Sequence, residues 1–241
     1  PVHFAAAALD ADGVIVLNRI KPHTNFSGTV ESGLSKMIAV GLGKQRGAEA
    51  FHTAALQQGY VTTIRQFMNV IQAEPELELL GGIGGVENRQ HELAVNESIP
   101  GRTLPEAEES LLEMAYDELP TLPVSDLDLL VINEIGKDIS GTGMDTNVIG
   151  RYVVVSADDP SKPNIDRIVV LGLTEETQGN AHGIGLADLT TTAVLQSADL
   201  QKMYTNALAS SSLTRSKLPI GLPSREDALV AGVQSTGVSD V

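Results

Sequence analysis

Cysteine and tryptophan are both absent from this chain of 241 residues. Without cysteine the chain has no disulfide bond, no thiolate zinc site, no protein-ligated iron–sulfur cluster and no cysteine nucleophile. A bound metal would need histidine, carboxylate or backbone ligands, or ligands that a cofactor brings. Aromatic residues make up only 3% of the chain, so we expect a core of Leu, Ile, Val and Ala.

Basic residues are also few: 16 lysines and arginines stand against 31 acidic residues, which gives a formal net charge of −15. Such a surface repels nucleic-acid phosphates and offers no polybasic patch to an anionic membrane, so we expect neither partner. No apolar run approaches the ~20 residues that a membrane-spanning helix needs. Residues 1–4 carry no basic start of a signal peptide, which favours the cytoplasm. Because the chain starts without Met and in a helical pattern, we expect the later part of a longer protein.

Apolar runs of strand length alternate along the chain with segments of helical periodicity. Strands are predicted at 13–18, 77–86, 92–98, 127–133, 167–173 and 217–222, and helices at 2–9, 45–73 with a break at Gly59, 105–118 with Thr103 as N-cap, 186–198, 199–209 and from Ser224 onward. The run at 13–18 is continuous, as in strands buried on both faces. This order predicts an α/β fold with mostly parallel sheets flanked by helices. Two prolines within 119–125 indicate a boundary between two α/β domains, 1–121 and 122–241.

The segment after the first predicted strand, residues 18–36, combines a histidine, hydroxyl groups, glycines and a lysine. In α/β folds, ligands gather at the carboxyl ends of strands. Glycines allow close approach of a ligand, and backbone N–H groups with hydroxyls can bind a phosphate at the start of a helix. The segment lacks the Gly-Lys-Ser/Thr ending of a Walker A loop. A polar turn with a solvated lysine is the alternative interpretation.

A second loop, residues 133–145, follows the strand at 127–133 and again carries a lysine, carboxylates and glycines. Its Lys137 can bind a substrate carboxylate as a compact positive charge, with surface ion pairs as the alternative. Among the five histidines, His52 falls in the long helical stretch, where a ligand role competes with a structural one. His182 lies in a glycine-rich loop, where it either takes part in catalysis or satisfies backbone groups.

Several of these residues belong to an ordered set of short motifs. The set reads Pro22-His23, Phe26-Ser27-Gly28, Ser32-Gly33-Leu34-Ser35-Lys36 and His52, followed in the second half by Glu134-Ile135-Gly136-Lys137, the segment 179–188 and Leu218-Pro219-Ile220. In this order, and over most of the chain, the set resembles the nickel-dependent lactate racemase family.

The resemblance implies a racemase or epimerase of a small 2-hydroxy acid that works by reversible hydride transfer. Its cofactor would be the nickel-pincer nucleotide, nickel pyridinium-3,5-bisthiocarboxylic acid mononucleotide, joined to Lys36 through a thioamide. His52 would be the protein ligand of nickel, His23 the acid/base, and Lys137 a substrate contact. The residues near the nucleotide phosphate would be Ser27, Gly28, Ser32 and Gly33. Residues 1–121 would be the remainder of an N-terminal cofactor-binding domain and 122–241 a C-terminal domain, with the site between them.

Two departures from the family bear on this expectation. The spacing from His23 to Lys36 is longer than is typical, through an apparent insertion near 29–31. The family's other histidine, and its Arg and Asp residues for phosphate and substrate, would come from a preceding segment. The alternatives are a phosphate- or nucleotide-dependent enzyme without nickel, and a catalytically inactive cofactor-binding relative.

Overall fold

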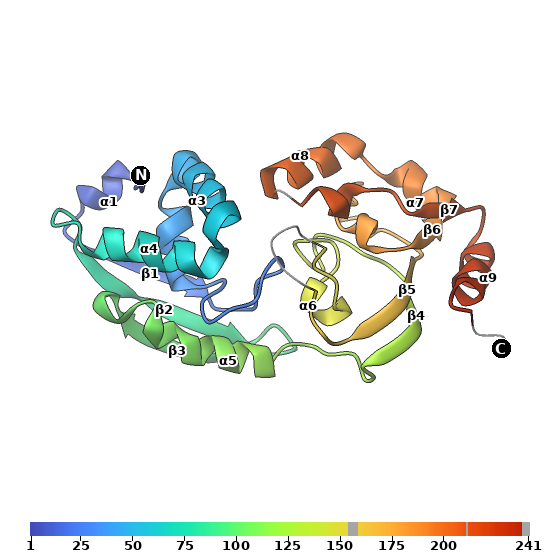
Figure 1. Cartoon of the computed structure of the whole chain (residues 1–241), viewed down its shortest axis with the longest axis horizontal. Helices are drawn as coiled ribbons and strands as arrows, with labels where there is room; N and C mark the ends of the chain where they lie inside the picture. The colour runs from blue at the N-terminus through green and yellow to red at the C-terminus, as the bar shows by residue number, and fades with distance from the viewer. Residues whose placement is uncertain (154–158, 211, 238–241) are drawn as a thin grey trace. The chain divides into compact units, whose positions relative to one another are not determined.

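The computed structural model describes residues 1–153, 159–210 and 212–237. The chain divides into two compact units, Pro1–Pro120 and Thr121–Val241. The first runs from blue to green in Figure 1 and the second from green to red. The division falls inside 119–125, the segment whose two prolines indicate a boundary in the sequence. Each unit has a sheet of its own.

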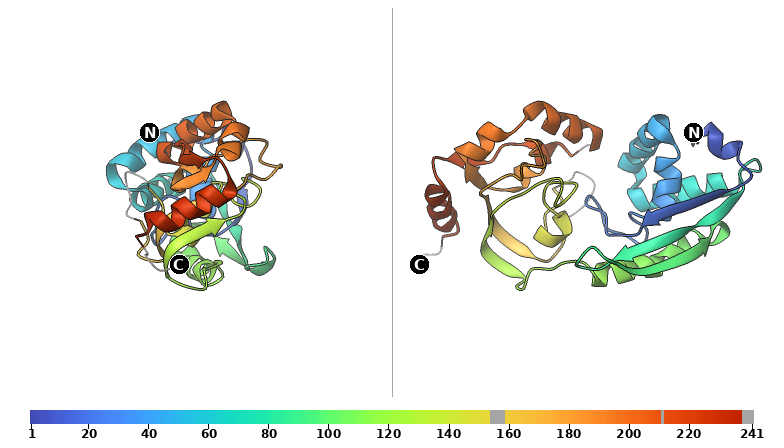
Figure 2. Two further views of the ribbon diagram at one scale, coloured as in Figure 1. Left: turned by 90° about the vertical axis from the view of Figure 1, so that its right-hand side faces the viewer. Right: turned by 180° about the vertical axis from the view of Figure 1, so that it is seen from behind.

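The first unit is built on a three-stranded sheet of order β1-β2-β3. Strands β1 (Val14–Arg19) and β2 (Leu79–Glu87) are parallel and lie side by side in Figure 2, whereas β3 (Leu93–Pro100) is antiparallel to β2. Its helices are α1 (Ala6–Leu9), α2 (Leu34–Lys36), α3 (Lys44–Gln58), α4 (Tyr60–Gln72) and α5 (Glu109–Asp117). A π-helical turn, Met37–Gly41, continues α2.

Strand β1 is exposed on one face, so the expectation of burial on both faces is wrong. The strand forms an edge of the sheet, and its residues alternate: Val16 is buried, while Ile15 and Leu17 are 60% and 68% exposed. The buried face packs toward α2, since a Cβ on Gly82, the β2 partner of Val16, would come within 2.9 Å of Leu34. An apolar run predicts a strand, but it does not say how many of its faces other elements cover.

The long helical stretch breaks at the predicted place. Gly59, with φ of +87°, separates α3 from α4 in a conformation that L side chains rarely adopt. The helix predicted at 105–118 is shorter, because a 3-10 turn at Glu106–Glu108 precedes α5. Thr103 does not cap that helix: its hydroxyl donates to the carbonyl of Pro100.

The second unit has a four-stranded, all-parallel sheet of order β4-β5-β6-β7. Its strands are β4 (Asp126–Ile132), β5 (Asn164–Val170), β6 (Leu189–Thr191) and β7 (Ile220–Leu222), and its helices are α6 (Thr146–Ile149), α7 (Thr192–Ser197), α8 (Leu200–Ser210) and α9 (Arg225–Ser235). Parallel strands flanked by helices confirm the predicted α/β class.

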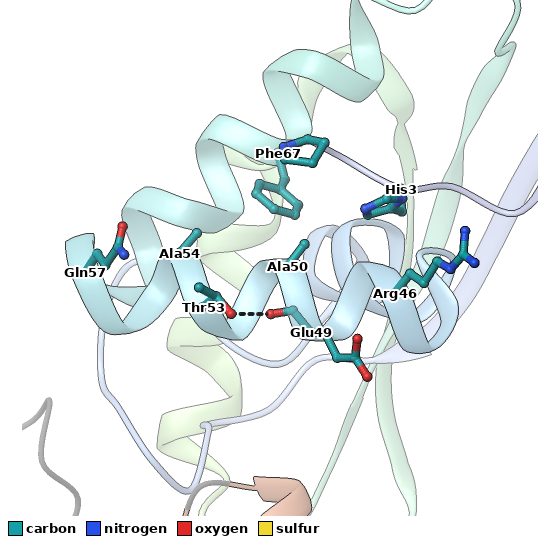
Figure 3. A pocket seen from close by; sticks show the side chains of 9 residues that line it. His3, Arg46, Glu49, Ala50, Thr53, Ala54, Gln57 and Phe67 are labelled. Atoms are coloured by element: carbon teal, nitrogen blue, oxygen red, sulfur yellow. Dashed lines mark hydrogen bonds between the residues drawn. The ribbon is translucent and has the colours of Figure 1, made fainter.

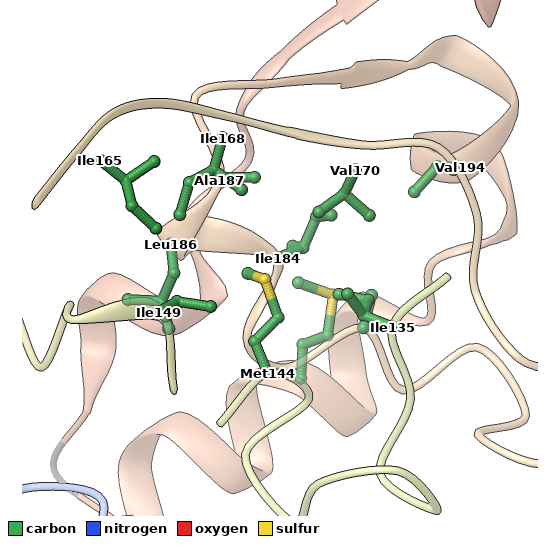
Figure 4. Close-up of a cluster of buried hydrophobic side chains, with 12 residues drawn as sticks. Ile135, Met144, Ile149, Ile165, Ile168, Val170, Ile184, Leu186, Ala187 and Val194 are labelled. Atoms are coloured by element: carbon green, nitrogen blue, oxygen red, sulfur yellow. The ribbon is translucent and has the colours of Figure 1, made fainter. Parts of the chain in front are cut away.

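The larger core cluster of the second unit consists mainly of Ile, Leu, Val and Ala, as the composition predicts, together with Met144 and Met203. Figure 4 shows Ile135, Ile168 and Ile184 within it, each 2% exposed or less. The helix predicted at 186–198 is wrong in its first part, where β6 forms instead. The buried hydroxyl of Thr190 donates there to the carbonyl of Val170 in the neighbouring strand, at 2.7 Å. None of the helices in the described residues has the length and apolar character needed to cross a membrane.

Candidate functional site

The loop between β1 and α2 is closed at its base. Lys21 and Ser32 form an isolated antiparallel bridge, in which the Lys21 N–H donates to the Ser32 carbonyl at 2.9 Å. The side-chain amide of Asn18, near the end of β1, donates to the carbonyl of Gly33 at 3.0 Å. These contacts hold the two ends of the loop together, so the predicted site residues within it share one region.

His23 and Lys36 meet across this loop. His23 Nε2 and Lys36 Nζ lie 3.5 Å apart, and the backbone N–H of Asn25 donates to His23 Nδ1 at 3.0 Å. A ring nitrogen that accepts a hydrogen bond carries no hydrogen, so the neutral imidazole carries its hydrogen on Nε2. Nε2 then donates toward Lys36, whose nitrogen accepts only as an uncharged amine.

The surroundings of Lys36 favour that uncharged amine. Burial lowers the pKa of its ammonium group below the ordinary value, and the positive charge of Lys21 lowers this pKa further. An unprotonated lysine is a nucleophile, which is the form that bonds covalently to a carbonyl-type carbon. The environment therefore suits the covalent role that the resemblance implies for Lys36.

His52 lies on α3 and is half-buried. Its ring meets the rings of Phe51 and Tyr60 edge-on, at centroid distances of 5.6 and 6.2 Å. Burial lowers the pKa of its imidazole below the ordinary value, and the positive charge that Lys36 carries when it is protonated lowers this pKa further. A neutral imidazole is the form that ligates metals, so this environment suits a ligand.

Tyr60 lies beside both histidines of the first unit's candidate site. Its ring stacks on Phe26 at a centroid distance of 4.5 Å, and Phe26 lies 4.5 Å from the ring of His23. The centroid of Tyr60 is 6.2 Å from those of both His23 and His52. Sequence reasoning missed Tyr60, because it follows a helix-breaking glycine and belongs to no motif. The scarcity of aromatic residues is the one signal that could have found it.

A buried carboxylate accepts hydrogen bonds from two backbone N–H groups of the loop. Glu31 is 2% exposed, and its oxygens accept from the N–H of His23 at 2.5 Å, the N–H of Gly28 at 2.8 Å and the hydroxyl of Tyr116 at 2.8 Å. Burial raises the pKa of this carboxyl group above its ordinary value, and the hydrogen bonds act in the opposite direction.

A second buried carboxylate occupies the start of α2. Glu108, also 2% exposed, accepts from the backbone N–H groups of Leu34 at 2.8 Å and Ser35 at 3.2 Å. Burial again raises the pKa of the carboxyl group, against the hydrogen bonds. Neither glutamate stands out in the sequence, because a carboxylate that bonds to backbone N–H groups needs no motif.

The four residues predicted near a nucleotide phosphate all lie in this loop. The N–H of Gly28 donates to one internal carboxylate, and a Cβ on Gly33 would come within 2.8 Å of the other. Ser27 is exposed and Ser32 is half-buried. The Gly28 N–H is therefore already bonded within the loop, and the Ser27 hydroxyl lies 3.2 Å from the hydroxyl of Tyr116.

In the second unit, Lys137 is half-buried and bonded to neutral groups. Its backbone N–H donates to Thr177 Oγ1 at 3.3 Å, and its Nζ donates to Asn206 Oδ1. Burial lowers the pKa of its ammonium group. A carboxylate would give this ammonium a charged acceptor, which makes a stronger hydrogen bond than an amide oxygen.

His182, on the same unit, is 3% exposed. Its Nδ1 lies 2.9 Å from the Ser216 hydroxyl, which donates its hydrogen to the carbonyl of Met203, so Nδ1 is the donor of the pair. Burial, with the charges of Lys137 and Arg215, lowers the pKa of His182 to about 4. Sequence reasoning missed Arg215, which is 1% exposed and follows no motif.

A cavity of about 470 Å³ opens along α3, beside the first residues of the chain. Figure 3 shows His3, Arg46, Glu49 and Phe67 around it. None of its lining residues is a predicted site residue, so the cavity and the His23–Lys36 pair are separate features.

Within the described residues, no group of three or more His, Asp or Glu side chains could hold a metal ion. Comparisons of the chain with protein-family models, with curated proteins and with solved structures found no match.

Proposed function

We propose that this chain belongs to an isomerase that inverts the hydroxyl-bearing carbon of a small 2-hydroxy acid, with a nickel-pincer nucleotide as cofactor. The observation that carries the proposal is the approach of Lys36 Nζ to His23 Nε2 at 3.5 Å. The motifs that resemble the lactate racemase family give these two residues and His52 the roles of covalent attachment, proton transfer and nickel ligation.

The residues present fit such a cofactor in two respects. Lys36 is half-buried, and the positive charge of Lys21 acts on it. Both the burial and this charge lower its pKa, which favours the nucleophilic, uncharged amine. His52 offers one neutral imidazole, and a cofactor whose own carbon and two sulfurs bind nickel needs one protein nitrogen. When bound, the cofactor would supply reversible hydride transfer at the substrate carbon.

His23 would exchange the hydroxyl proton of the substrate. Its Nε2 holds the ring hydrogen in the described conformation, because the N–H of Asn25 donates to Nδ1. To accept a proton at Nε2, the neutral ring must first shift its hydrogen to Nδ1, which breaks the contact with Asn25. Base catalysis by His23 therefore includes a local opening of this turn.

Lys137 would hold the substrate carboxylate. Its flexible stem and compact charge suit an anion that must react from both faces. The neutral acceptor that now takes its hydrogen bond, Asn206, would be replaced by the carboxylate. We propose the cytoplasm as the compartment of the protein.

The test is intact mass and nickel stoichiometry of the full-length protein, made in cells that also make the pincer cofactor. We expect one nickel and a covalent adduct that peptide mapping assigns to Lys36, with both lost in Lys36→Ala. Lys217→Ala removes an exposed lysine of the other unit as a matched control and should keep both. No adduct and no nickel, in a host shown to load a known family member, would refute the proposal.

A further inference from the structure

One carboxylate holds both ends of the segment that carries His23. Glu31 Oε2 accepts from the His23 N–H at 2.5 Å, and Oε1 accepts from the Gly28 N–H at 2.8 Å. From α5, the hydroxyl of Tyr116 donates to the same Oε1 at 2.8 Å and ties the carboxylate to a helix. The backbone of 23–28 is thus fixed at its first and last residues to one buried side chain.

The contacts that orient the His23 ring lie inside this clamped segment. The N–H of Asn25 donates to Nδ1 at 3.0 Å, and the ring of Phe26 lies 4.5 Å from the imidazole, tilted by 32°. Phe26 in turn stacks on Tyr60 at 4.5 Å. All of these contacts require the backbone of 23–28 to keep its present turn.

Stability alone is a poor explanation for Glu31. A carboxylate that is 2% exposed loses its hydration, and its donors here are neutral groups, so burial carries a free-energy cost that no bonded cation offsets. Glu31 also lies within the loop between His23 and Lys36, which are 13 residues apart in the sequence. A loop of this length needs restraints to keep two of its residues 3.5 Å apart, because the unrestrained backbone has many other conformations.

We propose that Glu31 is a positioning residue, which holds the imidazole of His23 in one tautomer with Nε2 directed at Lys36. The proposal rests on the proposed function for the chemical role of His23, while the geometry that it tests exists without cofactor.

The experiment is two-bond ¹H–¹⁵N spectroscopy of the full chain labelled with ¹⁵N-histidine, without nickel, at pH 7.5. Five histidines give few signals, and His23→Gln assigns the signal of His23. We expect the wild type to show His23 in the Nε2–H tautomer alone. Glu31→Gln should bring the Nδ1–H tautomer to a comparable population, because one amide oxygen cannot accept at both ends of the segment.

Two controls separate positioning from general loss of structure. Asp188→Asn alters a carboxylate that accepts the Ile168 N–H in the second unit, and should leave His23 unchanged. The Nδ1–H tautomer of His182 should be the same in all folded variants. If Glu31→Gln does not fold, Tyr116→Phe is the second variant, because it removes only the hydrogen bond from the Tyr116 hydroxyl to Glu31 Oε1. It should raise the population of the Nδ1–H tautomer of His23 by a smaller amount.

An unchanged His23 tautomer in folded Glu31→Gln, or in Tyr116→Phe where the former does not fold, would overturn the proposal. So would an Nδ1–H tautomer in the wild type. These spectra need neither nickel nor substrate, so their outcome is independent of the cofactor test.

Discussion

His182 should make the protein sensitive to mild acid. The ring is 3% exposed, and burial with the nearby charges of Lys137 and Arg215 lowers its pKa from 6.5 to about 4. Between these values the unfolded chain binds a proton that the folded chain does not bind. The free energy of unfolding therefore falls as the pH falls from 6.5 to about 4. At neutral pH the stabilising contribution of uncharged His182 is fully present.

The expected magnitude follows from the two pKa values. At about 1.4 kcal/mol per pH unit, the contribution of His182 that is lost by pH 4 is about 3 kcal/mol. That is a large share of the roughly 5–15 kcal/mol by which folded domains are stable. Protonation would also place a third positive charge near Lys137 and Arg215. Burial and charge repulsion therefore both lower the stability of the folded protein in acid.

The assay is urea unfolding followed by circular dichroism from pH 7 to pH 4, for the wild type and His182→Asn. Asparagine has an amide donor near the position of Nδ1, so the bond to the Ser216 hydroxyl can persist while titration is removed. The difference in unfolding free energy between the two proteins should change by about 3 kcal/mol across this range. Parallel pH profiles would show that His182 is solvated or already charged, and would refute the reasoning.

Three further predictions concern the first unit. His52→Ala should lower nickel content while the adduct mass on Lys36 persists, as read by metal analysis and intact mass; full nickel would exclude His52 as the ligand. His23→Gln should keep nickel and lower turnover by about 100-fold or more, as isotope exchange at the substrate carbon would show; unchanged exchange would remove His23 from proton transfer. Burial raises the pKa of Glu108, so its ionisation lowers the free energy of unfolding as the pH rises from 4.5 through the folded pKa. Glu108→Gln should remove this decrease in urea titrations, and an unchanged profile would contradict it.

The sequence alone predicts those features of the fold and site that residues close together in the chain determine. Alternating strand and helix patterns predicted the α/β class, and Gly59 marked the break between α3 and α4. His23 and Lys36 were predicted to share a loop because they are 13 residues apart between a strand and a helix, and the structure brings their nitrogens to 3.5 Å. Periodicity could not reveal the exposed face of β1 or the short strand β6, since both depend on what packs against them.

The residues that the sequence did not single out are those whose partners are distant or lie in the backbone. Glu31 acts on backbone N–H groups three and eight residues away and on Tyr116, 85 residues away. Glu108 reaches 74 residues back to the N–H of Leu34. A single sequence contains no signal for such bonds, because any glutamate at the right point in space would make them. Glu31 is only eight residues from His23 in the sequence, and it accepts the His23 N–H at 2.5 Å. The spectrum of Glu31→Gln measures whether this bond helps to fix the tautomer of His23.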